Sequence, residues 1–494
     1  MNYRETTGSV ENPYLKTVLV LVLGMASVIL AVSLADYGFK PVFAVSAILA
    51  VVVYVSFFPS QRTLVKSSLI FLGLGIPFNL DVNLFLRPYV GVASVDIGVS
   101  LLCAIALYVL FFYEHVTKRT EVLFRYNRSL FWAPLLYMMA GFLSFYNAAS
   151  PELVILELVR LTMLFLIFFI IMNLRNKEQI ATFVFSLSIG IVFEALIAFY
   201  QYRTGQALGL GVLGERLFPL GAGYMTRAGG TIGHPNLVGY FFEMLVPLML
   251  AMSIVEEKGL RKLWYMAAAL CGLLGMFATM SRGSWITVPV SLPLVFFVAY
   301  GKRLTQPKTY MFLLPGVLAA LLLFFLFVLP VISHRLTLED PAARSRIPLN
   351  AAAFSIVKQF PVTGVGLNNL GAVFRTYDTT GGSAVFTTEG DVQHIVHNIY
   401  LWVWSETGTI GLVTFAGIFL SAFYVGLKTL FAAQPWQRGV LIGAVSGLLA
   451  QTIHGLVDPG FRILMSTSML FYSLIGLIGA VALTSAADKE QTGS

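Results

Sequence analysis

Long apolar runs separated by short polar segments recur along almost the whole sequence. About twenty apolar residues are enough for a helix to cross a bilayer. The third run is interrupted by Pro77, Asn79, Asp81 and Asn83, which indicates a broken or re-entrant segment. Runs of membrane-spanning length lie at 15–34, 40–58, 66–85, 93–113, 129–147, 153–173, 181–201, 236–255, 262–280, 284–300, 311–333, 404–427, 437–457 and 464–484.

Because lipid tolerates only helices and closed barrels, and because these runs do not alternate as barrel strands do, the pattern predicts an all-α polytopic membrane protein. We expect about 12–14 transmembrane helices. The longest polar segment, 334–397, has helix-like apolar spacing at 347–358 and again at 367–377, so it predicts one large helical loop. Three parts follow: a transmembrane bundle over 1–333 that includes an outer loop at 202–235, the large loop 334–397, and C-terminal transmembrane helices over 398–494.

Composition supports the membrane assignment. The chain has 494 residues, of which 57% are hydrophobic and 11% charged, whereas a soluble domain is nearer half apolar and a quarter charged. Cys103 and Cys271 stand far apart in separate apolar runs, so no disulfide or cysteine-based metal site can be argued from them. The net charge of +8 is not gathered on a soluble domain, which excludes nucleic acid as the expected partner.

Lysine and arginine predict the orientation, because they favour the cytoplasmic side. With the N-terminus inside, the short outer loops hold only Lys40, Arg87, Arg282 and Arg462. We therefore expect both termini in the cytoplasm and the long loops in the periplasm. The inner segments hold Arg4, Lys16, Arg62, Lys66, Lys118, Arg119, Arg125, Arg128, Arg175, Lys177, Lys258, Arg261, Lys262, Lys302, Arg303, Lys308, Lys428, Arg438 and Lys489.

Candidate chemistry gathers where the outer segments meet the spans. Arg227 precedes a span in the stretch that ends Gly-His234-Pro-Asn236, and Arg282 lies in the short turn Ser-Arg-Gly-Ser between two spans. His397 and Asn398 end the large loop. Guanidinium groups bind diphosphate oxygens bidentately, and a neutral imidazole can act as a base. The alternative for each arginine is interfacial snorkelling.

Other ionisable residues are less informative. A single loop histidine is usually only solvated, and His454 lies inside a span, where a structural role is expected. Glu157 and Arg160 are spaced to pair across one helical turn, whereas Glu194 and Glu243 stand alone in their runs. No His-x-x-x-His pair and no acidic cluster accompanies the loop histidines, so the sequence predicts neither a metal site nor a cofactor.

These motifs, in this order, resemble the bacterial O-antigen ligase and O-antigen polymerase superfamily. The resemblance covers roughly residues 180–430. It is carried by Arg227 with Gly-His234-Pro-Asn236, by Ser-Arg282-Gly-Ser, and by a large outer loop that ends in His397-Asn398 and is followed by Glu406-x-Gly-x-x-Gly. Within the loop, Arg346 followed by Pro-Val-Thr-Gly-Val-Gly at 361–366 is similar to the loop pattern of that superfamily.

The resemblance implies a GT-C-like, metal-independent, inverting glycosyltransferase of the bacterial inner membrane. Its donor would be an undecaprenyl-diphosphate-linked glycan, its acceptor the lipid A core or another glycan, and its active site periplasmic. His397 would be the general base. Arg227, Arg282 and Arg346 would bind the diphosphate, with support from Asn398, Glu406, His234 and Asn236.

Other functions stay open at this point. An O-antigen or exopolysaccharide polymerase of the same superfamily would use the same residues on another lipid-linked glycan. A small-anion transporter would also place basic residues at an outer vestibule, but the spans lack the paired broken helices and midplane polar residues expected of a transport site. A scaffold subunit of an export machine would use the large loop as a docking surface.

Overall fold

The computed structural model of the chain describes residues 60–78, 81–84, 94–220, 225–257, 259–300, 346–379 and 395–492. The predicted spans at 15–34, 40–58 and 311–333 lie outside the described residues. Within the described part, eight helices are long and apolar enough to cross a membrane. This confirms the all-α polytopic class predicted from the apolar runs.

The helices follow the predicted spans closely. Up to the large loop they are α3 (Gln61–Gly75), α4 (Val99–Val116), α5 (Arg128–Leu143), α6 (Pro151–Met172), α7 (Lys177–Thr204), α8 (Pro235–Val255), α9 (Gly259–Thr279) and α10 (Arg282–Tyr300), with short 3₁₀ turns η2 (Ser144–Asn147) and η3 (Gly211–Leu213). From the loop onward they are α14 (Arg346–Gln359), α15 (Leu370–Tyr377), α16 (Ile399–Leu430), α17 (Pro435–His454), α18 (Gly460–Ile463) and α19 (Met465–Thr492).

The third predicted span, 66–85, is broken in its second half, as its proline and polar residues indicated. Helix α3 ends at Gly75, because Pro77 has no backbone N–H with which to continue the helical hydrogen bonds. The chain then forms β1 (Asp81–Leu84), which pairs antiparallel with β2 (Val95–Gly98). A second hairpin joins β3 (Leu217–Leu220) to β4 (Met225–Ala228). The all-α expectation included neither hairpin.

Among the described helices of membrane-spanning length, α8 is the most enclosed, since most of its residues are buried. It packs against α9, α10 and α17, and α17 in turn packs against α19. Helix α17 accommodates polar residues such as Gln451 and His454 because these neighbours shield them from lipid. The helices that deliver the site residues are therefore held together by one continuous core.

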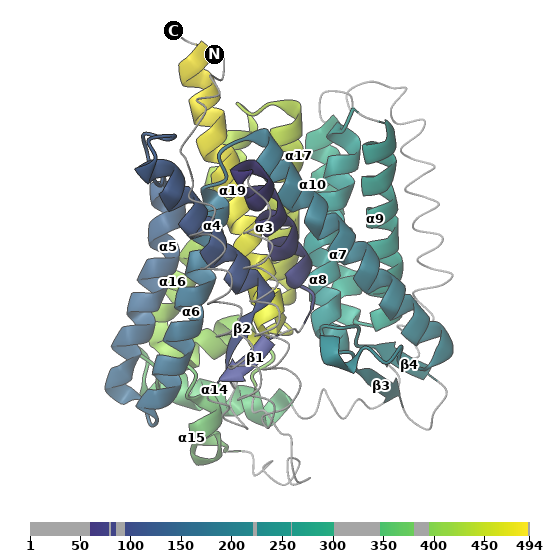
Figure 1. Cartoon of the computed structure of the whole chain (residues 1–494). Coiled ribbons are helices and arrows are strands. Elements are labelled where there is room, and N and C mark those ends of the chain that lie inside the picture. The colour runs from purple at the N-terminus through teal and green to yellow at the C-terminus, as the bar shows by residue number, and fades with distance from the viewer. Residues whose placement is uncertain are drawn as a thin grey trace, which may run out of the picture.

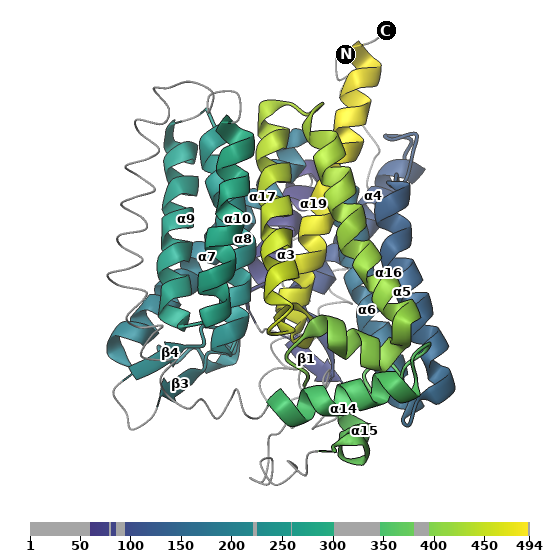
Figure 2. The same ribbon diagram turned by 180° about the vertical axis from the view of Figure 1, so that it is seen from behind.

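The two ends of the bundle differ in their secondary structure and in their basic residues (Figures 1 and 2). Both hairpins, α14 and α15 lie at one end, and α14 runs across that end below α16 and α17. At the opposite end α5 and α7 begin and α16 ends. These helix ends carry Arg128, Lys177 and Lys428, so the arrangement agrees with the charge asymmetry from which the orientation was predicted.

The large loop is attached to α16 where two glycine-containing segments meet, 364–366 in the loop and Gly408 in α16. Helix α16 is kinked at Gly408, whose φ is 66°. The kink lets the backbone carbonyls of Ser405 and Glu406 accept hydrogen bonds from the N–H groups of Val365 and Gly366, at 3.1 and 3.0 Å. A Cβ on Gly408 would lie 2.1 Å from the backbone of Val362. Only glycine allows this close approach at a positive φ.

Candidate functional site

His397 lies at the start of α16, beside the turn that joins α17 to α18. Asn398 caps α16, and its Oδ1 accepts hydrogen bonds of 3.0 Å from the N–H groups of Tyr400 and Leu401. This cap fixes the residue before it. The Nδ1 atom of His397 lies 3.4 Å from Oδ2 of Asp458, and the histidine side chain is 31% exposed. With Nδ1 turned to the carboxylate, Nε2 is the nitrogen left to meet a substrate.

Asp458 joins His397 to the arginine that precedes α8. Its Oδ2 accepts a hydrogen bond of 3.0 Å from Nδ2 of Asn236. The Oδ1 atom of Asn236 in turn accepts one of 2.6 Å from Nη2 of Arg227. Nε of Arg227 also donates to the carbonyl of Thr279, at the end of α9. Residues predicted from two separate motifs, His397 from one and Asn236 and Arg227 from the other, are thus brought together through one aspartate.

Burial by itself raises the pKa of Asp458, but its contacts with His397, His454 and Asn236 outweigh burial and lower the pKa to about 2. Asp458 is therefore ionised at any working pH. A fixed carboxylate at Nδ1 orients the imidazole and stabilises the imidazolium that forms when Nε2 accepts a proton.

His234 plays a different role from His397. Its Nδ1 accepts a hydrogen bond of 3.2 Å from the N–H of Asn236, so its side chain caps α8. The pKa of His234 is lowered to about 4, mainly by burial and also by the charges of Arg227, His397 and Arg216, while Asp458 acts in the opposite direction. His234 is therefore neutral near pH 7 and acts as a cap.

Arg282 begins α10, and the residue after it comes very close to α17. A Cβ on Gly283 would lie 1.9 Å from Nε2 of His454, and the backbone N–H of Asp458 donates to the carbonyl of His454 at 3.0 Å. The start of α10, where Arg282 lies, is therefore linked through Gly283 and His454 to the backbone of Asp458. Arg346 begins α14, its Nε is buried without a hydrogen-bond partner among the described residues, and its charge acts on His454.

Glu406 holds the large loop in place. It is buried, its Oε2 lies 2.5 Å from Nη2 of Arg462, and its carboxylate accepts hydrogen bonds from the N–H groups of Asn368 and Leu370 just before and at the start of α15. The Nε1 atom of Trp402 donates to it as well, at 2.8 Å. Glu406 therefore ties α15 and α18 to α16. Its support of the diphosphate site stays a prediction.

Sequence reasoning missed Asp458 and misjudged the acids inside the spans. Asp458 stands in Asp-Pro-Gly, which reads as an ordinary turn. Glu243 is not alone, because its carboxylate lies 2.9 Å from Nδ1 of His454. Glu194 accepts hydrogen bonds from Thr231 in the loop that carries Arg227 and His234. The pairing of Glu157 with Arg160 is confirmed, at 2.7 Å.

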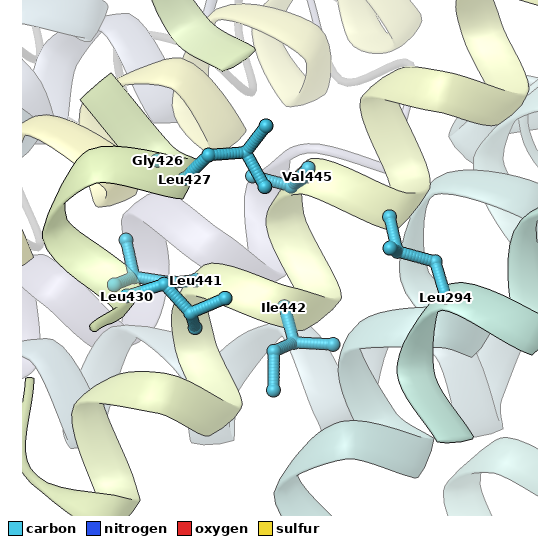
Figure 3. A pocket seen from close by; sticks show the side chains of 7 residues that line it. All are labelled: Leu294, Gly426, Leu427, Leu430, Leu441, Ile442 and Val445. Atoms are coloured by element: carbon cyan, nitrogen blue, oxygen red, sulfur yellow. The ribbon is translucent and has the colours of Figure 1, made fainter. Parts of the chain in front are cut away.

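The described residues include no group of three or more His, Cys, Asp or Glu side chains placed to hold a metal ion; a metal-independent reaction stays a prediction. A small pocket between α10, α16 and α17 is lined only by apolar side chains and a glycine, among them Leu294, Leu430 and Ile442 (Figure 3). It contains none of the residues of the candidate site. Its lining suits hydrocarbon and offers no group for catalysis.

Fold and site together define a multi-pass membrane protein with a histidine, a carboxylate and arginines gathered at one end of its helical bundle. Residues 267–416 match the family model described as O-antigen ligase. This match includes Arg282, Arg346, His397 and Glu406, and it confirms the resemblance to the O-antigen ligase and polymerase superfamily. The described part of the chain is thus a multi-pass membrane protein that is similar to O-antigen ligases over residues 267–416.

No curated protein matches the chain. Among solved structures, one described as "Structural coordination of polymerization and crosslinking by a peptidoglycan synthase complex" is similar over 73% of this chain and 98% of that chain, with 17% sequence identity and a TM-score of 0.41.

Proposed function

We propose that the protein is an O-antigen ligase-like inverting glycosyltransferase. It moves a glycan from undecaprenyl diphosphate to a hydroxyl of an acceptor sugar, the lipid A core, at the periplasmic face. The single observation that carries the proposal is the chain of contacts from His397 through Asp458 and Asn236 to Arg227. That chain sets a base and a fixed cation beside each other at the loop-covered end of the bundle.

The reaction assigns one task to each group. Nε2 of His397 accepts the proton of the acceptor hydroxyl, whose oxygen attacks the anomeric carbon of the donor glycan. The bond from that carbon to the diphosphate oxygen breaks, and the electron pair leaves with undecaprenyl diphosphate. Asp458 stabilises the imidazolium. Arg227 and Arg282, with Arg346 from the loop, balance the negative charge that grows on the diphosphate.

The orientation and the acceptor are part of the proposal. Lys and Arg at the opposite end of the bundle favour that end as cytoplasmic, which leaves the site and both termini on opposite sides of the membrane. A ligase is preferred to a polymerase because of the large-loop pattern around Arg346. The reaction at the diphosphate is the same for both.

The test uses purified full-length protein in liposomes, with undecaprenyl-diphosphate-linked glycan as donor and lipid A core as acceptor. Wild type should form the joined product, and Arg282→Lys should lose at least about 10-fold in rate because a point charge cannot reproduce the guanidinium fork. Wild-type turnover by Arg282→Lys would mean that this arginine only snorkels. Product on a second lipid-linked glycan, but never on lipid A core, would favour the polymerase. Passage of anions without any glycan product would favour a transporter.

A further inference from the structure

Glu243 and His454 form an ion pair inside the bundle that the proposed reaction does not use. Nδ1 of His454 lies 2.9 Å from Oε2 of Glu243, and the side chains are 2% and 0% exposed. Glu243 also accepts hydrogen bonds of 2.6 Å from Thr287 on α10 and from Gln451 on α17. One carboxylate of α8 therefore holds polar groups of two neighbouring helices.

The ring of His454 touches both halves of the candidate site. One edge faces Gly283: a Cβ there would lie 1.9 Å from Nε2 and 2.5 Å from Cε1. Because Gly283 directly follows Arg282, the ring limits where α10 can begin. Its face stacks on Tyr240, with ring centroids 4.0 Å apart and planes 17° apart.

His454 is connected to Asp458 by two routes, one from its ring through Tyr240 and one from its backbone carbonyl. The hydroxyl of Tyr240 donates a hydrogen bond to the backbone carbonyl of Asp458. The carbonyl of His454 accepts hydrogen bonds from the backbone N–H groups of Val457 and Asp458, at 2.9 and 3.0 Å. A shift of the His454 ring would therefore move the aspartate beside His397 as well as the start of α10.

We propose that Glu243 and His454 are positioning residues of the transferase. Their ion pair holds the His454 ring in contact with Gly283 and thereby fixes the positions of Arg282 and Asp458 relative to each other. This inference rests on the proposed function. A fold alone does not require such a pair, because well-packed apolar residues often stabilise a core equally well or better. Precise placement does require it, since a displacement of about 1 Å at a catalytic group can cost about 10²-fold in rate.

Two substitutions disturb the pair from opposite sides. Gly283→Ala leaves both ionisable groups in place but forces the ring away from α10. Glu243→Gln keeps the shape of the side chain and removes the charge that holds Nδ1. The matched control is Gly417→Ala on α16, where an added Cβ meets nothing within 4 Å. All variants are studied as full-length protein in liposomes, and rates are divided by the amount of folded protein measured by size-exclusion chromatography.

We expect Gly283→Ala and Glu243→Gln to lower kcat about 10²-fold, whereas Gly417→Ala keeps the wild-type rate. Binding of undecaprenyl diphosphate, measured directly, should weaken by a smaller factor than kcat falls, because Arg227 stays in place while displaced Arg282 and Asp458 lose their joint action in the transition state. A wild-type kcat in either folded variant would overturn the inference, and so would a loss of activity that only follows the loss of folded protein. Absence of transfer by the wild type would instead refute the proposed function.

Discussion

His234 makes the stability of the protein depend on pH in a way that can be calculated. Burial lowers its pKa from 6.5 to about 4, with Arg227, His397 and Arg216 acting in the same direction and Asp458 against it. The unfolded chain therefore binds a proton before the folded protein does. The stability that neutral His234 contributes is fully present above pH 6.5 and is lost as the pH falls toward 4.

The size of the effect follows from linkage. Between pH 7.5 and pH 5, the unfolded state gains most of one proton and the folded state almost none. Before solvent screening is considered, this difference lowers the free energy of unfolding by about 2 kcal/mol. The side chain is partly exposed, so solvent screening reduces the expected effect to about 1–2 kcal/mol.

The matched variant is His234→Asn, because asparagine is a good N-cap and does not titrate in this range. Unfolding free energies of both proteins, from SDS titrations in mixed micelles at pH 7.5 and pH 5, give the difference. Wild type should lose about 1–2 kcal/mol more than His234→Asn. Equal losses in the two proteins would show that His234 is not held neutral, and its assignment as a cap rather than a second base would have to be given up.

Two further predictions concern the loop and the metal. Glu406→Gln should leave Arg462 buried with Glu157 as its remaining carboxylate partner among the described residues, 3.6 Å away. The attachment of the large loop should therefore be destabilised by about 3 kcal/mol. Amide hydrogen exchange in 361–377 should become faster, and unchanged protection would contradict the anchoring role. Transfer should continue in EDTA because arginines take the place of a divalent ion at the diphosphate; loss of activity that Mg²⁺ or Mn²⁺ restores would contradict this.

The helices could be predicted from the sequence because the bilayer imposes both their length and their apolar character. Most described helices begin and end within about five residues of the expected limits. Helix α4 begins six residues later, α19 ends eight residues later, and the span at 66–85 stops at Gly75, where Pro77 and the polar residues after it favour a hairpin over a continuous helix. Helix α14 was also predicted, from the helical spacing of Ile347, Ala351 and Phe354, but the wrong face was expected to pack: Ile347 and Phe354 are exposed, and Leu349, Ala352, Ala353 and Ile356 form the buried face.

The assembly of the site could be predicted only in part. Individual arginines and His397 could be recognised from their place at the edge of the membrane. Asp458 could not, because its partners Asn236 and His397 lie far away in the sequence and its own surroundings resemble a simple turn. Glu243 seemed isolated for the same reason: His454, 211 positions later, reaches it only after α8 and α17 pack together. The kink at Gly408 likewise could not be predicted, because it depends on the distant loop backbone that hydrogen-bonds to α16 beside it.

The central claim is that His397 removes the proton of the acceptor hydroxyl, and it is tested most directly by the single-turnover rate of His397→Ala. The measurement uses purified protein loaded with undecaprenyl-diphosphate-linked glycan, followed by addition of the lipid A core. Loss of a general base should slow transfer by about 10²–10⁴-fold, while donor binding stays near that of wild type because Arg227 and Arg282 remain. Transfer by His397→Ala at the wild-type rate would contradict the account.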